Sequence, residues 1–195
     1  TLTISRRNSM RYASMRNLDI SNGEGVGVSL FVQGCPFHCK NCFNSETWDF
    51  NGGKEWTEEI REKFIKLIDR PYIKRVSFLG GECLAEQNLD EVLSLVKEIN
   101  RRFPDKIIWL YTGYIFEQCR PFSEDGLLPG SNFAPHLQEI LKKRWEIVGN
   151  VDVLVDGEYI DEQKDLTLKF RGSKNQRVID VQQSLAQDKI ILYCD

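Results

Sequence analysis

The sequence lacks long apolar runs, a signal-peptide core and an excess of charge of one sign. None of its apolar runs approaches the roughly 20 residues that span a bilayer, and residues 1–22 mix four arginines with polar side chains. The formal net charge is −3 over 195 residues, with a pI near 5.6, which gives no electrostatic case for nucleic-acid binding. We therefore expect a cytoplasmic protein without a membrane or nucleic-acid partner.

A second pair of cysteines at zinc-ribbon or zinc-finger spacing is also missing. Of the six cysteines, three crowd into eight residues, at Cys35, Cys39 and Cys42, and the other three are scattered. A disulfide framework would spread its cysteines more evenly and would need an oxidising compartment. The clustering indicates metal or redox chemistry in a reducing compartment instead.

Short apolar runs alternate with amphipathic segments along the chain. This alternation predicts βαβ units and a parallel sheet in one α/β domain over residues 1–195. Thr57 is expected to cap the first helix, and Asn88 to start the second with a capping box that includes Glu91. A loop insertion rich in Pro and Gly is expected at about 119–131. The expected strands are 26–33, 75–79, 107–111, 151–155 and 166–170, and the expected helices are 56–69, 88–103 and 135–148.

The residues that could bind a ligand or take part in chemistry directly follow the expected strands. Right-handed crossovers place the C-terminal ends of parallel strands at one edge of a sheet, where α/β proteins bind their ligands. That edge would collect the cysteine loop together with Gly80-Gly81-Glu82, Thr112-Gly113 and Asp156-Gly157. The sequence therefore predicts one ligand site built from these four loops.

The cysteine loop favours an iron–sulfur cluster over a zinc ion. Thiolates suit both, but a structural zinc ion normally takes four protein ligands. His38 is a candidate for the fourth, although it lies between two cysteines in a tight loop, where its ring would have trouble reaching the same ion. In a cluster of four irons, three cysteines bind three irons and leave one iron open for a substrate or cofactor. A zinc-binding module is kept as the more distant alternative.

The cysteine spacing Cys-x3-Cys-x2-Cys after a first strand resembles the signature of the radical S-adenosylmethionine superfamily. Asn41 replaces the aromatic residue that is common there before the third cysteine, but it fits the glycyl-radical activases of anaerobic ribonucleotide reductase, as does the pair Phe43-Asn44. The resemblance to these activases extends from about Arg11 to Asp180. The other strings that carry it are 19–25 (DISNGEG), 45–48 (SETW), 109–114 (WLYTGY), 153–157 (VLVDG) and 168–177 (LKFRGSKNQR).

The resemblance implies a fold, two cofactors and a set of site residues. The fold would be an incomplete, laterally open parallel (β/α) barrel of the radical S-adenosylmethionine type. One [4Fe-4S] cluster would be held by Cys35, Cys39 and Cys42, with S-adenosylmethionine on its open iron. No catalytic side chain is expected beyond the cluster and the bound S-adenosylmethionine. Cys83, where the family usually has Pro, is interpreted as a small packing residue, with an extra cluster ligand as the alternative. The implied residues for S-adenosylmethionine are Asn41, Cys42, Phe43, Gly80, Gly81, Glu82, Thr112, Asp156 and Arg171.

The resemblance also implies an activity and partners. An external one-electron donor, such as flavodoxin or ferredoxin, would reduce the cluster. Reductive cleavage of S-adenosylmethionine would give methionine and a 5′-deoxyadenosyl radical, which would take a hydrogen atom from a glycine in the large subunit of the class III anaerobic ribonucleoside-triphosphate reductase. The nearer alternative is an activase of another glycyl-radical enzyme, such as pyruvate formate-lyase.

Overall fold

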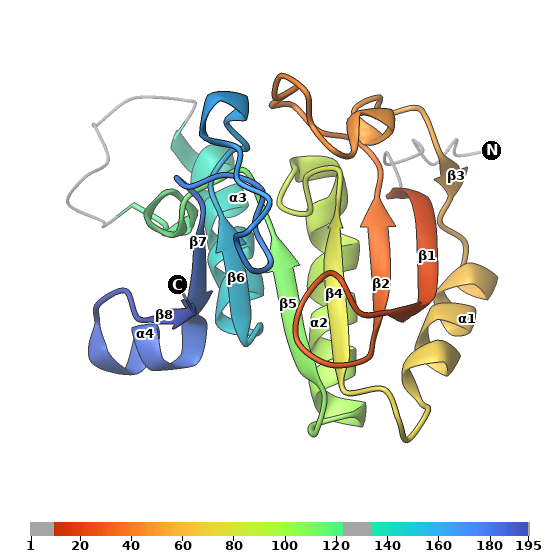
Figure 1. Ribbon diagram of the computed structural model, residues 1–195. Coiled ribbons are helices and arrows are strands. Elements are labelled where there is room, and N and C mark those ends of the chain that lie inside the picture. Colours follow the sequence, from red (N-terminus) through yellow and green to blue (C-terminus); the bar gives the residue numbers. More distant parts are fainter. Residues whose placement is uncertain (1–9, 123–133, 195) are drawn as a thin grey trace.

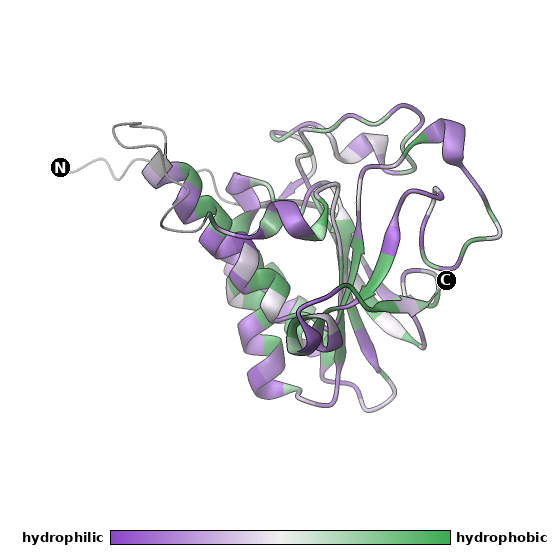
Figure 2. Ribbon diagram, turned by 90° about the vertical axis from the view of Figure 1, so that its left-hand side faces the viewer, coloured by the Kyte–Doolittle hydropathy of each residue, from purple (hydrophilic) through white to green (hydrophobic). Residues whose placement is uncertain are grey.

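The protein folds around one eight-stranded sheet, which is covered by helices on one face (Figures 1 and 2). The computed structural model describes residues 10–122 and 134–194, so most of the predicted insertion at 119–131 lies outside the described residues. The strand order across the sheet is β3-β1-β2-β4-β5-β6-β7-β8. In chain order the strands are β1 (Arg11–Asp19), β2 (Gly27–Val32), β3 (Lys54–Glu55), β4 (Arg75–Gly80), β5 (Ile107–Tyr111), β6 (Val153–Asp156), β7 (Arg177–Asp180) and β8 (Leu192–Cys194).

The central strands of the sheet are parallel, and the strands at both of its edges pair antiparallel. Strands β2, β4, β5 and β6 pair in parallel, as the alternation of strands and helices predicts. Strands β1 and β3 on one side, and β7 and β8 on the other, pair antiparallel and were not predicted. The predicted strand at 166–170 is wrong, because β6 pairs with β7 and residues 166–170 form turns and bends.

The three predicted helices are present, each beginning within two residues of its predicted start, and a fourth helix at 181–187 was not predicted. The Ile60 N–H lies 3.3 Å from the Thr57 hydroxyl oxygen that accepts from it, which confirms Thr57 as the cap of α1. The predicted Asn88 cap is wrong, since α2 begins two residues earlier and the Asn88 side chain is buried. It donates to the backbone carbonyls of Gln33 (3.1 Å) and Glu82 (2.9 Å), so it ties the helix to two loops of the sheet edge. The α-helices are α1 (Glu58–Ile68), α2 (Glu86–Arg102), α3 (Ala134–Gly149) and α4 (Val181–Gln187).

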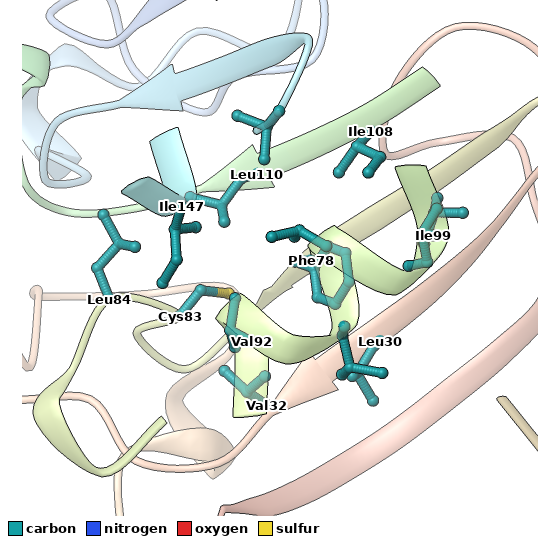
Figure 3. Packing of buried hydrophobic residues seen from close by; sticks show 14 of the residues in the cluster. Leu30, Val32, Phe78, Cys83, Leu84, Val92, Ile99, Ile108, Leu110 and Ile147 are labelled. Atoms are coloured by element: carbon teal, nitrogen blue, oxygen red, sulfur yellow. The ribbon is translucent and has the colours of Figure 1, made fainter. Parts of the chain in front are cut away.

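The larger hydrophobic core lies between the helices and the sheet. Alternate residues of β5 show how the strands divide between two faces, because Ile108 and Leu110 join this core while Trp109 and Tyr111 belong to a smaller cluster on the other face. Figure 3 shows Cys83 among the residues of the larger core, beside Val92 and Ile147. Cys83 is fully buried there, which agrees with its interpretation as a packing residue.

The second face of the sheet is covered by two loops instead of helices. The loop 20–26, between β1 and β2, crosses in front of β4 (Figure 1). The Arg75 guanidinium holds it there from below, since it donates to the backbone carbonyls of Asn22 (2.8 Å) and Asp19 (2.7 Å) and pairs with the Asp19 carboxylate at 3.4 Å. Both charged side chains are buried, and such a buried pair is maintained only when its remaining hydrogen bonds are also satisfied. The long connection 157–176, between β6 and β7, forms the other loop.

Candidate functional site

The cysteine loop leaves the C-terminal end of β2 through a tight glycine turn. Gly34 has φ +91°, and a Cβ at this position would lie 2.2 Å from the ring of Phe50, so only glycine fits. The N–H groups of Gly34 and Cys35 donate to the carbonyls of Thr47 (2.8 Å) and Trp48 (3.1 Å), which anchors the start of the loop to the 3-10 helix at 45–47. His38 (φ +51°) and Asn41 (φ +55°) give the loop its two left-handed residues. Asn is one of the residue types that tolerate this conformation best.

The three clustered cysteines are free thiols, each half-buried, on the wall of one cavity. Burial raises the pKa of the Cys35 thiol to about 11. The described side chains include no group of three His, Cys, Asp or Glu that converges on one point where a single metal ion could be held. A four-iron cluster does not require such convergence, because each thiolate binds a different iron. The His38 ring lies against Trp48, with 4.8 Å between ring centroids.

The cavity beneath the cysteine loop has a volume of about 610 Å³ and opens onto the second face of the sheet. Its floor is a row of cross-strand neighbours, in which Phe31 pairs with Leu79 and Tyr111 pairs with Val155. Loop 20–26 and the 157–176 connection both contribute residues to its lining. Of the residues predicted for S-adenosylmethionine, those that line the cavity are Cys42, Phe43, Gly80, Gly81, Glu82, Thr112 and Arg171.

The Gly80-Gly81 pair lets two loops approach at the sheet edge. A Cβ on Gly81 would lie 2.5 Å from the carbonyl oxygen of Gly34, and Gly80 has φ +102°. The next residue completes the contact, since the Glu82 N–H donates to that same Gly34 carbonyl at 2.8 Å. The glycines therefore bring the cysteine loop against the loop that carries Glu82.

The Glu82 carboxylate is buried and oriented by three donors. Its Oε1 accepts from the Leu84 N–H (2.8 Å) and the Thr112 hydroxyl (2.7 Å), and its Oε2 accepts from the Gly113 N–H (2.8 Å). Burial raises the pKa of Glu82, although these hydrogen bonds act in the opposite direction. A carboxylate has about four lone-pair sites, so one acceptor site on Oε2 is left for a donor in the cavity.

Arg171 faces the same cavity with an unused donor. Its Nη1 donates to the Gln176 carbonyl at 3.1 Å, whereas its Nε is buried and has no hydrogen-bond partner among the described residues. A buried guanidinium N–H normally has an acceptor. Arg171 is therefore suited to an anionic group that enters the cavity.

Two of the residues predicted for S-adenosylmethionine do not line the cavity. Asp156 is buried under the sheet edge, where its carboxylate accepts from the Phe116 N–H (2.8 Å) and binds the Arg177 guanidinium through both oxygens. Asn41 donates to Asp161 at 2.7 Å and is exposed. Contact of these two side chains with the cofactor stays a prediction. The Asp156 carboxylate already has a structural role, because it binds Arg177 and the Phe116 N–H.

A segment that the sequence analysis did not select, residues 158–162, lies against the cysteine loop. Lys40 pairs with Glu162 at 3.0 Å, and the rings of Phe43 and Tyr159 pack with centroids 5.2 Å apart. The Cys39 thiol is 3.9 Å from a Glu158 carboxylate oxygen. The residues of this segment carry no recognisable motif, so its position depends on tertiary structure.

Comparison with known proteins assigns the class of the site and then the family. A family profile described as "4Fe-4S single cluster domain" matches residues 21–179. A protein of Vibrio cholerae serotype O1 called anaerobic ribonucleoside-triphosphate reductase-activating protein is 37% identical over 169 residues, which cover 86% of this chain and 96% of that protein. The proteins of the same name from Escherichia coli K12 and Enterobacteria phage T4 are each 34% identical over 171 residues, covering 87% of this chain and 97% and 93% of theirs.

The chain therefore belongs to the family of anaerobic ribonucleoside-triphosphate reductase-activating proteins. This confirms the family indicated by the sequence motifs and the prediction of an iron–sulfur cluster. The described residues contain no helix long and apolar enough to cross a membrane.

Proposed function

We propose that this protein activates an anaerobic ribonucleoside-triphosphate reductase by generating a glycyl radical in its large subunit. The observation that carries the proposal is the placement of three free thiols on the wall of one cavity that Glu82 and Arg171 also line. The names of the relatives support the choice of partner. The parallel centre of the sheet supports a shortened, laterally open form of the radical S-adenosylmethionine barrel.

The residues around the cavity fit both cofactors. Cys35, Cys39 and Cys42 would hold a [4Fe-4S] cluster with one open iron. Glu82 has one acceptor site available for the ammonium group of S-adenosylmethionine, and the unpartnered Nε of Arg171 would donate to its carboxylate. Gly80 and Gly81 permit close approach of backbone to ligand at this edge.

When bound, the cluster and S-adenosylmethionine supply a one-electron reductive cleavage and the organic radical that abstracts a hydrogen atom from glycine. The chain itself orients and encloses the reactants. The Thr112 hydroxyl and the Gly113 N–H fix the Glu82 carboxylate, and the apolar floor of the cavity, with Phe31 and Leu79, would exclude water from the bound cofactors. The electron donor, expected to be flavodoxin or ferredoxin, and the cytoplasmic location stay predictions.

Replacement of one cysteine ligand tests the proposal. After anaerobic reconstitution with iron and sulfide, Cys39→Ala should bind less iron and should not cleave S-adenosylmethionine. Cys194→Ala is the matched control, because Cys194 lies in β8 and is outside the cavity lining. Cluster content and cleavage equal to wild type in Cys39→Ala would refute the assignment, and a colourless protein with one zinc per chain would indicate the zinc-binding alternative.

The identity of the partner is tested separately. Electron paramagnetic resonance should detect a glycyl radical when the reconstituted protein, S-adenosylmethionine and a reductant are mixed with the anaerobic reductase. The same assay with pyruvate formate-lyase should give no radical. A radical with pyruvate formate-lyase and none with the reductase would reassign the partner.

A further inference from the structure

The stretch between the second and third cysteines, residues 39–42, has little main-chain support. Its only backbone–backbone hydrogen bond within the described part of the chain is internal, from the Cys42 N–H to the Cys39 carbonyl at 3.1 Å. Asn41, immediately before the third cysteine, is left-handed at φ +55° and is exposed. The start of the loop differs, because two of its N–H groups donate to carbonyls of another segment. Side chains must therefore hold residues 39–42 in place.

The flanking segment, defined as residues 158–162, supplies these side-chain contacts. The Asp161 carboxylate is central, because its Oδ2 accepts from the Asn41 amide at 2.7 Å and its Oδ1 accepts from the Tyr159 hydroxyl at 2.8 Å. The two hydrogen bonds lower the pKa of Asp161, so its carboxyl is ionised at neutral pH. Hydrogen bonds to an ionised acceptor are stronger than those between neutral groups. Asp161 is therefore held by its own segment and in turn holds the cysteine loop.

The other polar contacts between the flanking segment and the cysteine loop are weaker or unsuited to bound iron. Lys40 pairs with Glu162 at 3.0 Å, but the two side chains are 71% and 69% exposed, and such surface pairs contribute little. The Cys39 thiol lies 3.9 Å from a Glu158 carboxylate oxygen, but a sulfur that binds iron is deprotonated and has no proton to donate. Of the polar contacts, the hydrogen bond to Asp161 is therefore the one expected to hold the loop when iron is bound.

The flanking segment is itself fixed by the turn 172–176, which belongs to one of the strings that carry the family resemblance. The Asn175 amide donates to the Glu158 carbonyl at 2.8 Å. The Ile160 N–H donates to the Ser173 hydroxyl at 3.2 Å, and Ser173 is fully buried. The backbone that carries the flanking carboxylates is thus held from behind, so their positions relative to the cysteine loop are defined.

We propose that Asp161 is a positioning residue for the iron–sulfur cluster. Its hydrogen bond to Asn41 fixes the stretch that contributes the second and third cysteine ligands. This inference rests on the proposed function, which assigns the three cysteines to the cluster, and adds a group that orients two of them. Groups outside the ligand set orient metal ligands, and their loss lowers metal affinity. Asn41 then acts on the cluster through Asp161, independently of any contact with S-adenosylmethionine.

Asp161→Ala tests the inference, with Glu162→Ala as the matched control. Each variant removes one carboxylate from the flanking segment, but only Asp161 binds Asn41. After anaerobic reconstitution with iron and sulfide, and without S-adenosylmethionine, an iron chelator should remove iron about fivefold faster from Asp161→Ala, the value of one hydrogen bond. Glu162→Ala should lose iron at the wild-type rate. The electron paramagnetic resonance spectrum of the reduced cluster should broaden in Asp161→Ala alone, because two ligands are no longer held in one position.

An exchange of the two side chains provides the second measurement. Asn41→Asp sets two carboxylates against each other and should raise the rate of iron loss above that of Asp161→Ala. Asp tolerates the left-handed conformation at this position. Adding Asp161→Asn should return the rate to near the wild-type value, because the amide at position 161 can donate to the carboxylate at position 41 and accept from the Tyr159 hydroxyl.

Iron loss at the wild-type rate in Asp161→Ala would overturn the inference. An equal increase in Glu162→Ala would assign the effect to charge and overturn it as well. A double variant that loses iron as fast as Asn41→Asp would also overturn it, and this comparison decides the matter if Asp161→Ala does not fold. Retention of the cluster in Cys39→Ala would refute the proposed function itself, which the Asp161 variants do not address.

Discussion

Gly81→Ala should separate the two loops that form the site. The added Cβ would lie 2.5 Å from the Gly34 carbonyl oxygen and 3.0 Å from its carbon, and both are backbone atoms that no rotamer change can move. The Glu82 N–H bond to that carbonyl would be lost or lengthened. Overpacking costs about 1–3 kcal/mol and a hydrogen bond about 1 kcal/mol. We therefore expect the free energy of unfolding to fall by about 2–4 kcal/mol.

Urea denaturation of the apoprotein and iron content after reconstitution measure the effect of Gly81→Ala. With a denaturant slope of about 2 kcal/mol per M, the midpoint should fall by about 1 M or more, and iron per chain should fall because Cys35 follows the displaced Gly34. Gly149→Ala is the control, since a Cβ at Gly149 meets no atom within 4 Å. A Gly81→Ala protein with the midpoint and iron content of wild type would refute the close contact of the two loops.

Three further perturbations test the scaffold. Burial raises the pKa of Asp19, but hydrogen bonds from Asn22 and Ser21 outweigh it and lower the pKa to about 2. The ionised carboxylate should therefore add about 2.5 kcal/mol to the free energy of unfolding above pH 4, and this contribution should be lost as the pH falls toward 2. Asp19→Asn should abolish this pH dependence in urea titrations, and an unchanged pH profile would contradict the prediction. Asn88→Leu leaves the buried Gln33 carbonyl without its donor, while the Glu82 carbonyl keeps the Ala85 N–H at 3.1 Å. The free energy of unfolding should fall by about 2 kcal/mol, whereas a neutral effect would show that the Gln33 carbonyl finds another partner. Thr57→Ala removes a helix cap and should cost about 1 kcal/mol by the same assay, unless another group caps α1.

The parallel centre of the fold could be predicted because its signals are local. Strands such as β5 are buried on both faces and appear as continuous apolar runs. The antiparallel strands carry weaker signals, since β1 contains charged and exposed residues that a tertiary partner holds in place. The segment 166–170 has a strand-like composition, but the strand that pairs with β6 is β7. The segment is therefore left outside the sheet, and Leu166 is 80% exposed.

The site was predictable to the extent that it consists of consecutive residues. The cysteine spacing and the Gly80-Gly81-Glu82 turn are visible in the sequence, and the structure brings them together. The ion pair of Asp156 with Arg177 joins residues 21 positions apart, and no local pattern reveals it. Asn88 shows the same limitation, because a side chain that matches a capping box is used instead to bind two carbonyls from other loops.

The short outer strands of the sheet have a consequence for recognition. Strand β3 has two residues, Lys54 and Glu55, both charged and exposed, and β8 has three. Short edge strands disfavour the addition of a strand from another polypeptide, and at β3 the two charged residues add to this effect. Extension of the sheet by a protein partner is therefore disfavoured, and we expect the partner's loop to approach through the open face. The short edge strands also disfavour edge-to-edge aggregation of the apoprotein before the cluster is inserted.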